Sequence, residues 1–334
     1  MTILNVSLGQ SIQAAINAAA PGDTIDVAAG TYTDQFLNIS QSVTLQAVGG
    51  QVLLRETRSP DDGKAMITEH GAQVTINGFD IAGVSVPDRN GAAIRYEGGS
   101  LTLSNDFFHD NQEGLLGAAD AGGSISIDHS EFAHNGDGSG STHNIYVGAI
   151  ASFSLTNSYI HDAVVGHEVK SRAASNNITG NRIFDNNGSA SYSIDLPNGG
   201  NATISGNQIE QGAFTQNPFI VAYGEEGASN PGMSFIVSAN TIVNDDTASN
   251  VGFLLDPATQ PSFIGNSVWG LALSQLPADP STMFLASRPV LDTAPIDFTN
   301  TGTVTPPPPP IVHGHGHNGH GHGHATSFLV ADHQ

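Results

Sequence analysis

The chain has 334 residues, of which 31 are Asp or Glu and nine are Lys or Arg, so its formal net charge is −22. Such an acidic surface excludes nucleic acid and anionic membranes as expected partners, because like charges repel. The absence of cysteine excludes disulfides and thiol chemistry. No apolar run reaches the roughly 18 residues of a membrane-spanning helix, so no membrane insertion is expected.

Residues 1–11 lack the basic start and apolar stretch of a cleavable signal peptide. We nevertheless expect an extracellular or cell-surface location, because acidic, cysteine-free repeat chains rich in Gly and Asn are typical of the exterior. A short amphipathic helix is predicted over residues 11–19, which carry apolar residues at Ile12, Ala15, Ile16 and Ala19. Pro21-Gly22-Asp23 ends this helix, and strands are predicted over residues 24–27 and 30–32.

A short phrase then recurs: an apolar-x-apolar pair, then Asn or a close substitute, then a further apolar residue. Its alternation directs apolar side chains to one face of a strand. A spacing of about twenty to thirty residues indicates stacked repeats, each of which needs its neighbours to bury its apolar row. We therefore predict one parallel β-helix domain over residues 1–298, capped by the helix over 11–19. The copies of the phrase lie at residues 74–79, 101–107, 125–132, 153–160, 181–183, 207–209, 240–242 and 266–268.

The segment from Ser11 to Ile25, followed by Gly30-Thr31-Tyr32, resembles the opening of the pectate-lyase-like right-handed β-helix superfamily. Together with the repeats, this resemblance covers roughly residues 5 to 275. It implies an all-β fold, a right-handed, single-stranded parallel β-helix, and a polysaccharide as the partner. We expect a monomer.

A second strand series emerges when residues are counted back from each repeat Asn. Its outward positions on three consecutive coils are Tyr146, Lys170 and Asp195. Neighbouring strands lie about 4.8 Å apart, so side chains on adjacent coils can touch one substrate. The series consists of residues 94–96, 145–147, 169–171, 194–196, 221–223 and 254–256.

Unlike side chains gather on these three coils, where Lys170 is one of only two lysines in the chain. Two interpretations stay open: a surface charge ladder worth about 0 to 1 kcal/mol per pair, or a polysaccharide groove carrying base, acid and cation. The expected outward grid is Asn144, Tyr146, Gly148, Glu168, Lys170, Arg172, Ser193, Asp195 and Pro197, and the other candidate residues are His143, His167, Arg182 and Tyr223.

Val169-Lys170-Ser171, followed by Asn177, Asn181 and Gly188, is similar to the Lys-Ser strand of β-helix alginate lyases. In that family a Lys serves as base and an Arg as acid. This chain departs from the family on the next coil, where Asp195-Leu196-Pro197 replaces an Arg-His pair. Gly166-His167 is also similar to the Gly-His strand of polygalacturonases, whose Arg-Ile-Lys element is missing here.

The leading hypothesis is a lyase that cleaves an acidic, uronate-containing polysaccharide by β-elimination. That reaction needs a base for the C5 proton, a cation for the adjacent carboxylate and a proton donor for the leaving oxygen. We assign Lys170 or Tyr146 as base, Arg172 as the carboxylate-neutralising cation and His143 or His167 as a helper. The carboxylates of Glu168 and Asp195 would raise the pKa of Lys170. The predicted substrate-binding residues are His143, Asn144, Glu168, Arg182 and Tyr223.

Three alternatives remain for this face. Glu168 and Asp195 could hold a Ca²⁺ ion that bridges an acidic glycan to the protein. The same pair could act as acid and base of a glycoside hydrolase. The β-helix could also bind glycan without cleaving it, or serve as a structural element. The insertion over residues 224–232, with Glu225 and Glu226, is either a wall of the site or a plain loop.

The C-terminal region has a different composition. Five prolines, Pro306 to Pro310, lie in a predicted stiff linker over residues 299–312. Residues 313–334 form a Gly- and His-rich tail that is expected to be disordered. Its closely spaced imidazoles predict binding of Zn²⁺, Ni²⁺ or Cu²⁺. The predicted ligands are His313, His315, His317, His320, His322 and His324.

Overall fold

The computed structural model describes residues 1–246, 252–277 and 279–300. The first compact unit of the chain spans Met1–Thr301. The tail histidines predicted to bind metal, His313, His315, His317, His320, His322 and His324, lie outside the described residues, as does the linker from residue 301 on.

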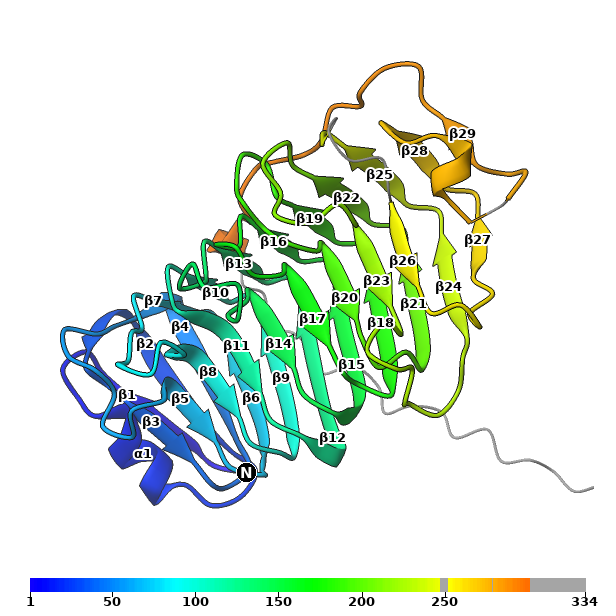
Figure 1. Ribbon diagram of the computed structural model, residues 1–334. Helices are drawn as coiled ribbons and strands as arrows, with labels where there is room; N and C mark the ends of the chain where they lie inside the picture. The colour runs from blue at the N-terminus through cyan, green and yellow to red at the C-terminus, as the bar shows by residue number, and fades with distance from the viewer. Residues whose placement is uncertain (247–251, 278, 301–334) are drawn as a thin grey trace, which may run out of the picture. The chain divides into compact units, whose positions relative to one another are not determined.

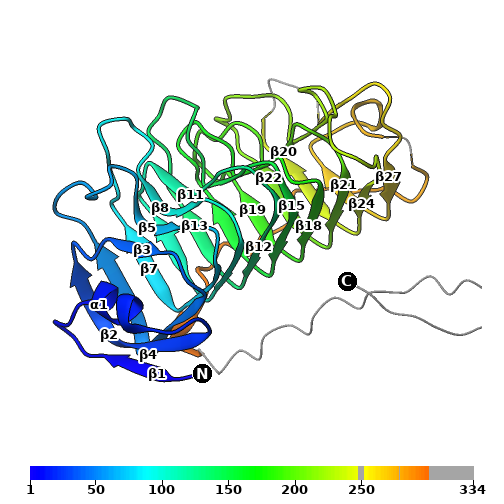
Figure 2. The same cartoon turned by 90° about the horizontal axis from the view of Figure 1, so that it is seen from below.

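The strands of successive coils stack side by side in three columns, and every pairing is parallel within the described residues (Figures 1 and 2). The first column contains β1 (Ile3–Val6), the first halves of β2 (Asp23–Thr33) and β4 (Val43–Arg55), β6 (Gln73–Asn77), β9 (Ser100–Ser104), β12 (Asp120–Asp128), β15 (Ile150–Thr156), β18 (Ser175–Thr179), β21 (Asn201–Ser205), β24 (Phe235–Ser238) and β27 (Ser262–Ile264). The second column contains the second halves of β2 and β4, then β7 (Phe79–Ala82), β10 (Phe107–His109), β13 (Glu131–Ala133), β16 (Tyr159–His161), β19 (Arg182–Phe184), β22 (Gln208–Gln211), β25 (Thr241–Asn244), β28 (Ser267–Trp269) and β29 (Met283–Phe284).

The third column carries the candidate site. It is a separate nine-stranded sheet, whereas the first two columns join into one sheet of 20 strands in the described part of the chain. The third column contains β3 (Leu37–Ile39), β5 (Ala65–Glu69), β8 (Ala92–Tyr96), β11 (Glu113–Gly117), β14 (Ile145–Val147), β17 (Val169–Ser171), β20 (Ile194–Leu196), β23 (Val221–Tyr223) and β26 (Phe253–Leu255). The predicted fold, a right-handed, single-stranded parallel β-helix, is confirmed.

The core is built by like residues stacking on like residues. Leu155 pairs with Ile178, and Ile178 pairs with Ile204, all three fully buried. Because the strand repeat is two residues, the side chains between them point outward. Each inward position thus forms an apolar row along the solenoid, which no single coil could bury alone.

A hydrogen-bonded ladder holds the corner between the first two columns. Asn207 Nδ2 donates to Asn240 Oδ1 and to the carbonyl of Ile178, both at 2.9 Å, while Asn207 Oδ1 accepts from the backbone N–H of Asn181 at 2.8 Å. The recurring Asn of the sequence phrase is therefore a buried structural residue. The residue before each ladder position has left-handed φ, for example 71° at Gly180, which explains the frequent Gly and Asn there. The ladder consists of Asp106, Ser130, Ser158, Asn181, Asn207, Asn240 and Asn266.

The predicted cap is confirmed as helix α1 (Ile12–Ala18). Ser11 caps its N-terminus by accepting a hydrogen bond from the backbone N–H of Ala14 at 3.2 Å. Ile12 and Ile16 are buried, so the helix lays its apolar face over the first coils, as Figure 2 shows at the N-terminal end.

After a short 3₁₀ helix, η1 (Leu273–Gln275), and β29, residues 285–300 run back along the second column. Figure 1 shows this segment descending beside the strands to a second 3₁₀ helix, η2 (Phe298–Asn300), near β10 and β13. Ile296 donates its backbone N–H to Glu131 at 2.7 Å, and the ring of Phe298 stacks on Phe107. The loss of periodicity in the sequence predicted the end of the coils but not this return.

Candidate active site

Three adjacent strands of the third column, β14, β17 and β20, position the central residues. Tyr146 pairs with Lys170 across β14 and β17, and Lys170 pairs with Asp195 across β17 and β20. The register predicted from the repeat spacing is confirmed. These strands lie in the middle of the column that faces the viewer in Figure 1.

A carboxylate bridges the two cations of this face. Glu226 Oε2 lies 2.7 Å from an Arg172 terminal nitrogen, and Glu226 Oε1 lies 3.3 Å from Lys170 Nζ. Lys170 Nζ also contacts Asp195 Oδ2 at 2.7 Å. Arg172 follows directly after β17, and its contact with Glu226 places it on the same side of the sheet as Lys170. Together they form a receptor for a carboxylate, which a side chain of the chain itself fills.

Arg172 is held by neighbours on both sides. Its Nε donates to the hydroxyl of Tyr146 at 3.1 Å, and a terminal nitrogen donates to Asn198 Oδ1 at 2.7 Å. Burial alone lowers the pKa of Arg172, but hydrogen bonds to Glu226 and Tyr146 outweigh it, and the pKa is raised. The guanidinium is a fixed cation beside the phenol oxygen of Tyr146.

Lys170 is also a cation. Burial alone lowers the pKa of its ammonium group, but the charge and hydrogen bond of Asp195, with the charge of Glu226, raise it overall. The predicted rise is confirmed, with Glu226 acting in the place of Glu168. A protonated Lys170 binds anions and does not accept a proton in this state.

Two histidines form a stacked, neutral pair next to Tyr146. The ring of His143 stacks on that of His167 at 4.7 Å and on that of Tyr146 at 5.7 Å. Burial, together with nearby groups that include Lys170, lowers the pKa of His143 to about 3 and that of His167 to about 2.

The tautomer of both rings follows from backbone hydrogen bonds. The N–H of His167 donates to His143 Nδ1 at 2.9 Å, and the N–H of Tyr192 donates to His167 Nδ1 at 3.1 Å. Both imidazoles therefore carry their proton on Nε2. His167 Nε2 lies 3.4 Å from Asp195 Oδ2, so this ring orients the carboxylate that holds Lys170.

Glu225 adds a second carboxyl group to Asp195. Burial raises the pKa of Glu225 to about 8, and its hydrogen bond to Asp195 adds to this rise. At neutral pH Glu225 is therefore protonated, and its carboxyl group lies against the fully buried Asp195. The loop over residues 224–232 thus forms one wall of the site. The position of two adjacent glutamates in a Gly-bounded insertion was its only signal in the sequence.

The expectation that Asn144 and Glu168 face the substrate is wrong. Both are fully buried at the corner before the third column. Glu168 accepts from the backbone N–H of Ala163 at 2.9 Å and from Asn144 Nδ2 at 2.5 Å. Burial raises the pKa of Glu168 well above its usual value, so it is a neutral structural group. Glu168 and Asp195 therefore do not form the acid and base pair of a hydrolase.

Arg182 and Tyr223 also lie away from the site. Arg182 belongs to β19 in the second column, where it donates to the carbonyl of Asp292 at 2.9 Å and lies over the ring of Tyr159. Tyr223 points into the core and donates its hydroxyl to the carbonyl of Gly200 at 2.5 Å. Arg182 was assigned to the site because it lies only twelve residues after Lys170 in the sequence. Within those twelve residues the chain turns a corner and enters another column.

The residues present do not fit the Ca²⁺ ion expected at this face. Asp195 Oδ2 is taken by Lys170 Nζ, and Glu168 is held by Asn144 and Ala163. Ca²⁺ needs six to eight oxygen ligands. At this face the carboxylate oxygens are already bound by other groups, and two positively charged side chains, Lys170 and Arg172, lie beside them.

No protein-family model matches this sequence, and no curated protein matches it. The structure is similar to the crystal structure of pectate lyase Pel9A, with a TM-score of 0.60, 17% identity and coverage of 84% of this chain and 79% of that chain. It is similar to ORF18 of Geobacillus virus E2, with a TM-score of 0.53, 14% identity and coverage of 80% and 56%. An alginate lyase from Paenibacillus sp. str. FPU-7 gives a TM-score of 0.43 at 15% identity, with coverage of 79% and 99%.

The stacked columns and the likeness to pectate lyase Pel9A define the fold class: the chain is a right-handed parallel β-helix. At these identities the likeness establishes the fold alone. In the described residues, no helix is long and apolar enough to cross a membrane.

Proposed function

We propose that the protein is a polysaccharide lyase that cleaves a uronate-containing polymer by β-elimination at Tyr146, Lys170 and Arg172. The observation that supports this most directly is the Glu226 carboxylate, bound by Arg172 at 2.7 Å and by Lys170 at 3.3 Å. A sugar carboxylate has the same charge and the same two acceptor oxygens. We infer that the uronate takes this position when Glu226 withdraws.

Arg172 and Lys170 would neutralise the substrate carboxylate, which makes the adjacent C5–H bond more acidic and stabilises the charge that develops as the proton leaves. This is the role assigned to Arg172 from the sequence, extended to Lys170. Lys170 itself is a poor base, because Asp195 keeps it protonated.

Tyr146 is then the proton-transferring group. In the proposed step its oxygen, 3.1 Å from Arg172 Nε, acts as the base in its ionised form. It would take the C5 proton as the C4–C5 double bond forms and the C4–O bond breaks, and the resulting hydroxyl would give that proton to the leaving oxygen, which restores the ionised Tyr146. His143, stacked on Tyr146, positions the phenol ring, and its Nε2–H is a neutral donor.

A non-catalytic glycan-binding function is the second candidate. The observation that favours it is that both cations are already paired with carboxylates, which suits reversible anion binding without proton transfer.

A polymeric substrate fits an extracellular location, which is part of the proposal. Fractionation of the producing cells would test this location.

The experiment measures the ultraviolet absorbance of unsaturated uronate product while the full chain acts on a panel of uronate polysaccharides. We expect product from the wild type and none from Arg172→Ala. Arg95→Ala is the matched control, because Arg95 also projects from the third column but pairs with Glu97 at 2.9 Å, away from Lys170. Uronate binding without product would favour the second candidate, and neither binding nor product would refute both.

A further inference from the structure

Two histidines and an aspartate meet at the corner that follows the second column. His134 follows β13, and Asp162 follows β16, at equivalent positions of successive coils with left-handed φ of 54° and 56°. His161 is the last residue of β16. The coil repeat therefore places His134 directly beside the His161-Asp162 pair, and its N–H donates to the His161 carbonyl at 3.3 Å.

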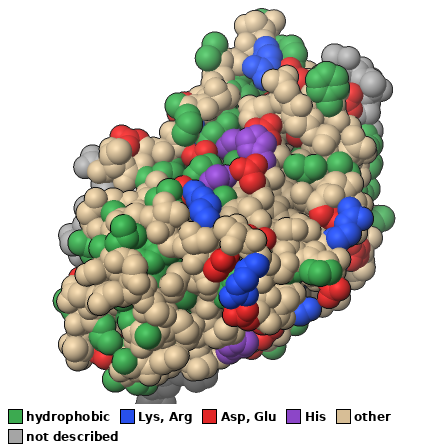
Figure 3. All heavy atoms as spheres, turned by 90° about the vertical axis from the view of Figure 1, so that its left-hand side faces the viewer, with side chains coloured by type: hydrophobic (Ala, Val, Ile, Leu, Met, Phe, Trp, Pro, Cys, Tyr) green, Lys and Arg blue, Asp and Glu red, His purple; other side chains and the backbone are tan. Residues whose placement is uncertain are grey.

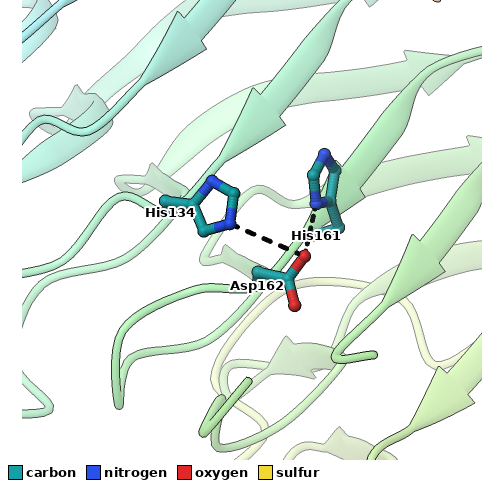
Figure 4. A group of neighbouring side chains, drawn as sticks. All are labelled: His134, His161 and Asp162. Atoms are coloured by element: carbon teal, nitrogen blue, oxygen red, sulfur yellow. Dashed lines mark hydrogen bonds and ion pairs between the residues drawn. The ribbon is translucent and has the colours of Figure 1, made fainter. Parts of the chain in front are cut away.

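The three side chains direct ligand atoms toward one point (Figure 4). One nitrogen from each imidazole and one carboxylate oxygen lie within 4.8 Å of one another. His161 Nδ1 lies 2.6 Å and His134 Nε2 lies 3.9 Å from Asp162 Oδ2. Ligand atoms around a tetrahedral Zn²⁺ ion, with bonds of about 2.0 Å, are roughly 3.3 Å apart. The His134 side chain is 56% exposed, so it can make the small movement required.

Glu131 already orients His161 for this role. Its Nε2 lies 3.2 Å from Glu131 Oε1, and Glu131 Oε2 is fixed by the backbone N–H of Ile296 at 2.7 Å. A metal-ligating histidine usually donates its other ring N–H to a carboxylate in this way. The 2.6 Å contact between His161 Nδ1 and Asp162 Oδ2 is a hydrogen bond donated by Nδ1, so a bound ion would replace that proton while Nε2 keeps its contact with Glu131.

The surroundings favour a cation. Asp185 lies on the next coil beside Asp162, and one oxygen of its buried carboxyl group has no hydrogen-bond partner. His134 and Asp162 line a surface cavity of about 300 Å³, which admits an ion and its water. Histidine and acidic side chains gather in one patch on the side of the solenoid seen in Figure 3, where Figure 1 places β10, β13 and β16.

We propose that His134, His161 and Asp162 bind a divalent transition-metal ion, Zn²⁺ in the first instance, with water in the remaining position. Two imidazoles and one carboxylate are ligands that Zn²⁺ accepts readily, and three protein ligands leave one position open. This site is distinct from the uronate site on β14, β17 and β20, and from the metal binding expected of the C-terminal tail.

The chain contains a matched control on an earlier coil. His109 Nδ1 lies 2.6 Å from Asp110 Oδ2, and its Nε2 lies 3.2 Å from Asp80 Oδ1, which repeats the pairing of His161. The preceding coil places Ala82 beside His109, so Gly83 stands at the position equivalent to His134 and supplies no second imidazole there. Among the described residues, the triad of His134, His161 and Asp162 is the one group of three metal-ligating side chains found.

The test is calorimetric titration of Zn²⁺ into the full-length wild type, His134→Ala and His109→Ala, with thermal melts of each. The tail is present in all three, so its contribution cancels. We expect His134→Ala to lose one Zn²⁺ per chain, or to bind it at least tenfold more weakly, and to lose the rise in melting temperature that Zn²⁺ causes. His109→Ala should behave as the wild type does.

Two further measurements keep the outcome decisive. Glu131→Gln should lower the affinity of the same site for Zn²⁺ about 10- to 100-fold, because it alters the carboxylate that orients His161. An anomalous difference map from Zn²⁺-soaked crystals should show a peak between His134, His161 and Asp162. Unchanged stoichiometry and melting shift in His134→Ala, with circular dichroism showing a folded chain, or anomalous peaks only elsewhere, would overturn the proposal.

Discussion

Glu226 should act as a displaceable competitor of the substrate, and Glu226→Ala should therefore lower KM. The Glu226 side chain is 46% exposed, while those of Lys170 and Arg172 are 11% and 24% exposed. An exposed ion pair contributes about 0.2 to 1 kcal/mol, and the upper half of that range, about 0.5 to 1 kcal/mol, applies here because Lys170 and Arg172 are largely buried. The two pairs made by Glu226 together therefore contribute about 1 to 2 kcal/mol. A uronate that displaces Glu226 breaks these two ion pairs, so its net binding free energy is weaker by the same amount.

Removal of the competitor should lower KM by about 5- to 30-fold, since 1.4 kcal/mol corresponds to about tenfold in affinity. The loop should stay in place, because Asn230 Nδ2 donates to the carbonyls of Ala173 at 2.9 Å and Arg172 at 3.2 Å. The value of kcat should be unchanged, because Glu226 leaves before the chemical step. The cost to the free energy of unfolding should be the same about 1 to 2 kcal/mol.

The assay is steady-state turnover of a uronate polysaccharide, with calorimetric binding of a uronate oligosaccharide as an independent readout. Glu97→Ala is the control, because Glu97 also pairs with an arginine of the third column, Arg95. An increased KM in Glu226→Ala would refute the reasoning, since it would mean that Glu226 contributes to substrate binding. An unchanged KM would mean that the uronate does not take this position.

Three further predictions concern Tyr146, His143 and the corner ladder. Tyr146→Phe should lower kcat about 10²- to 10⁴-fold with less than about threefold change in oligosaccharide affinity, and a normal kcat would refute its assigned role. Burial keeps His143 neutral, so its contribution to stability is complete above the unfolded pKa of about 6.5 and is lost as the pH falls toward the folded pKa of about 3. Wild-type protein should therefore lose about 2 kcal/mol more free energy of unfolding than His143→Gln when urea melts are compared between about pH 6.5 and pH 5. Asn207→Ala should lower the free energy of unfolding by about 2 to 4 kcal/mol because it leaves buried ladder partners unpaired, whereas the exposed Asn177→Ala should change it by less than about 0.5 kcal/mol.

The fold followed from the sequence because a solenoid repeats its physical requirements on every coil. Period-two alternation identified inward positions such as Leu103 and Ile127, and the recurring Asn marked the corner ladder. Counting back from that Asn also gave the register of Tyr146, Lys170 and Asp195. The return of residues 285–300 could not be predicted, because its contacts are single and unrepeated, such as Ile296 to Glu131.

The site followed from the sequence only where it lies on the strands. Lys170 and Tyr146 were placed correctly by their register, and Arg172, one residue past the end of β17, still lies on the outward side. Glu168 was assigned outward by alternation although it lies before β17, where the chain still turns. Alternation holds only within a strand, so residues at corners escape it. Glu226 reaches Lys170 from a loop 56 residues later, a contact that no local pattern contains.

The same stacking that makes the fold predictable also limits where chemistry can arise. Along one outward row of the third column the residues are, in order, Arg95, Leu116, Tyr146, Lys170, Asp195, Ala222 and Leu254. Each side chain in this row meets mainly the coil before and the coil after, about 4.8 Å away. A row of like residues serves the fold, as the Asn ladder does, but it cannot combine a proton acceptor with a cation and a carboxylate. Three unlike polar residues in succession, Tyr146, Lys170 and Asp195, interrupt this repetition between Leu116 and Ala222, and the proposed site is therefore centred on them.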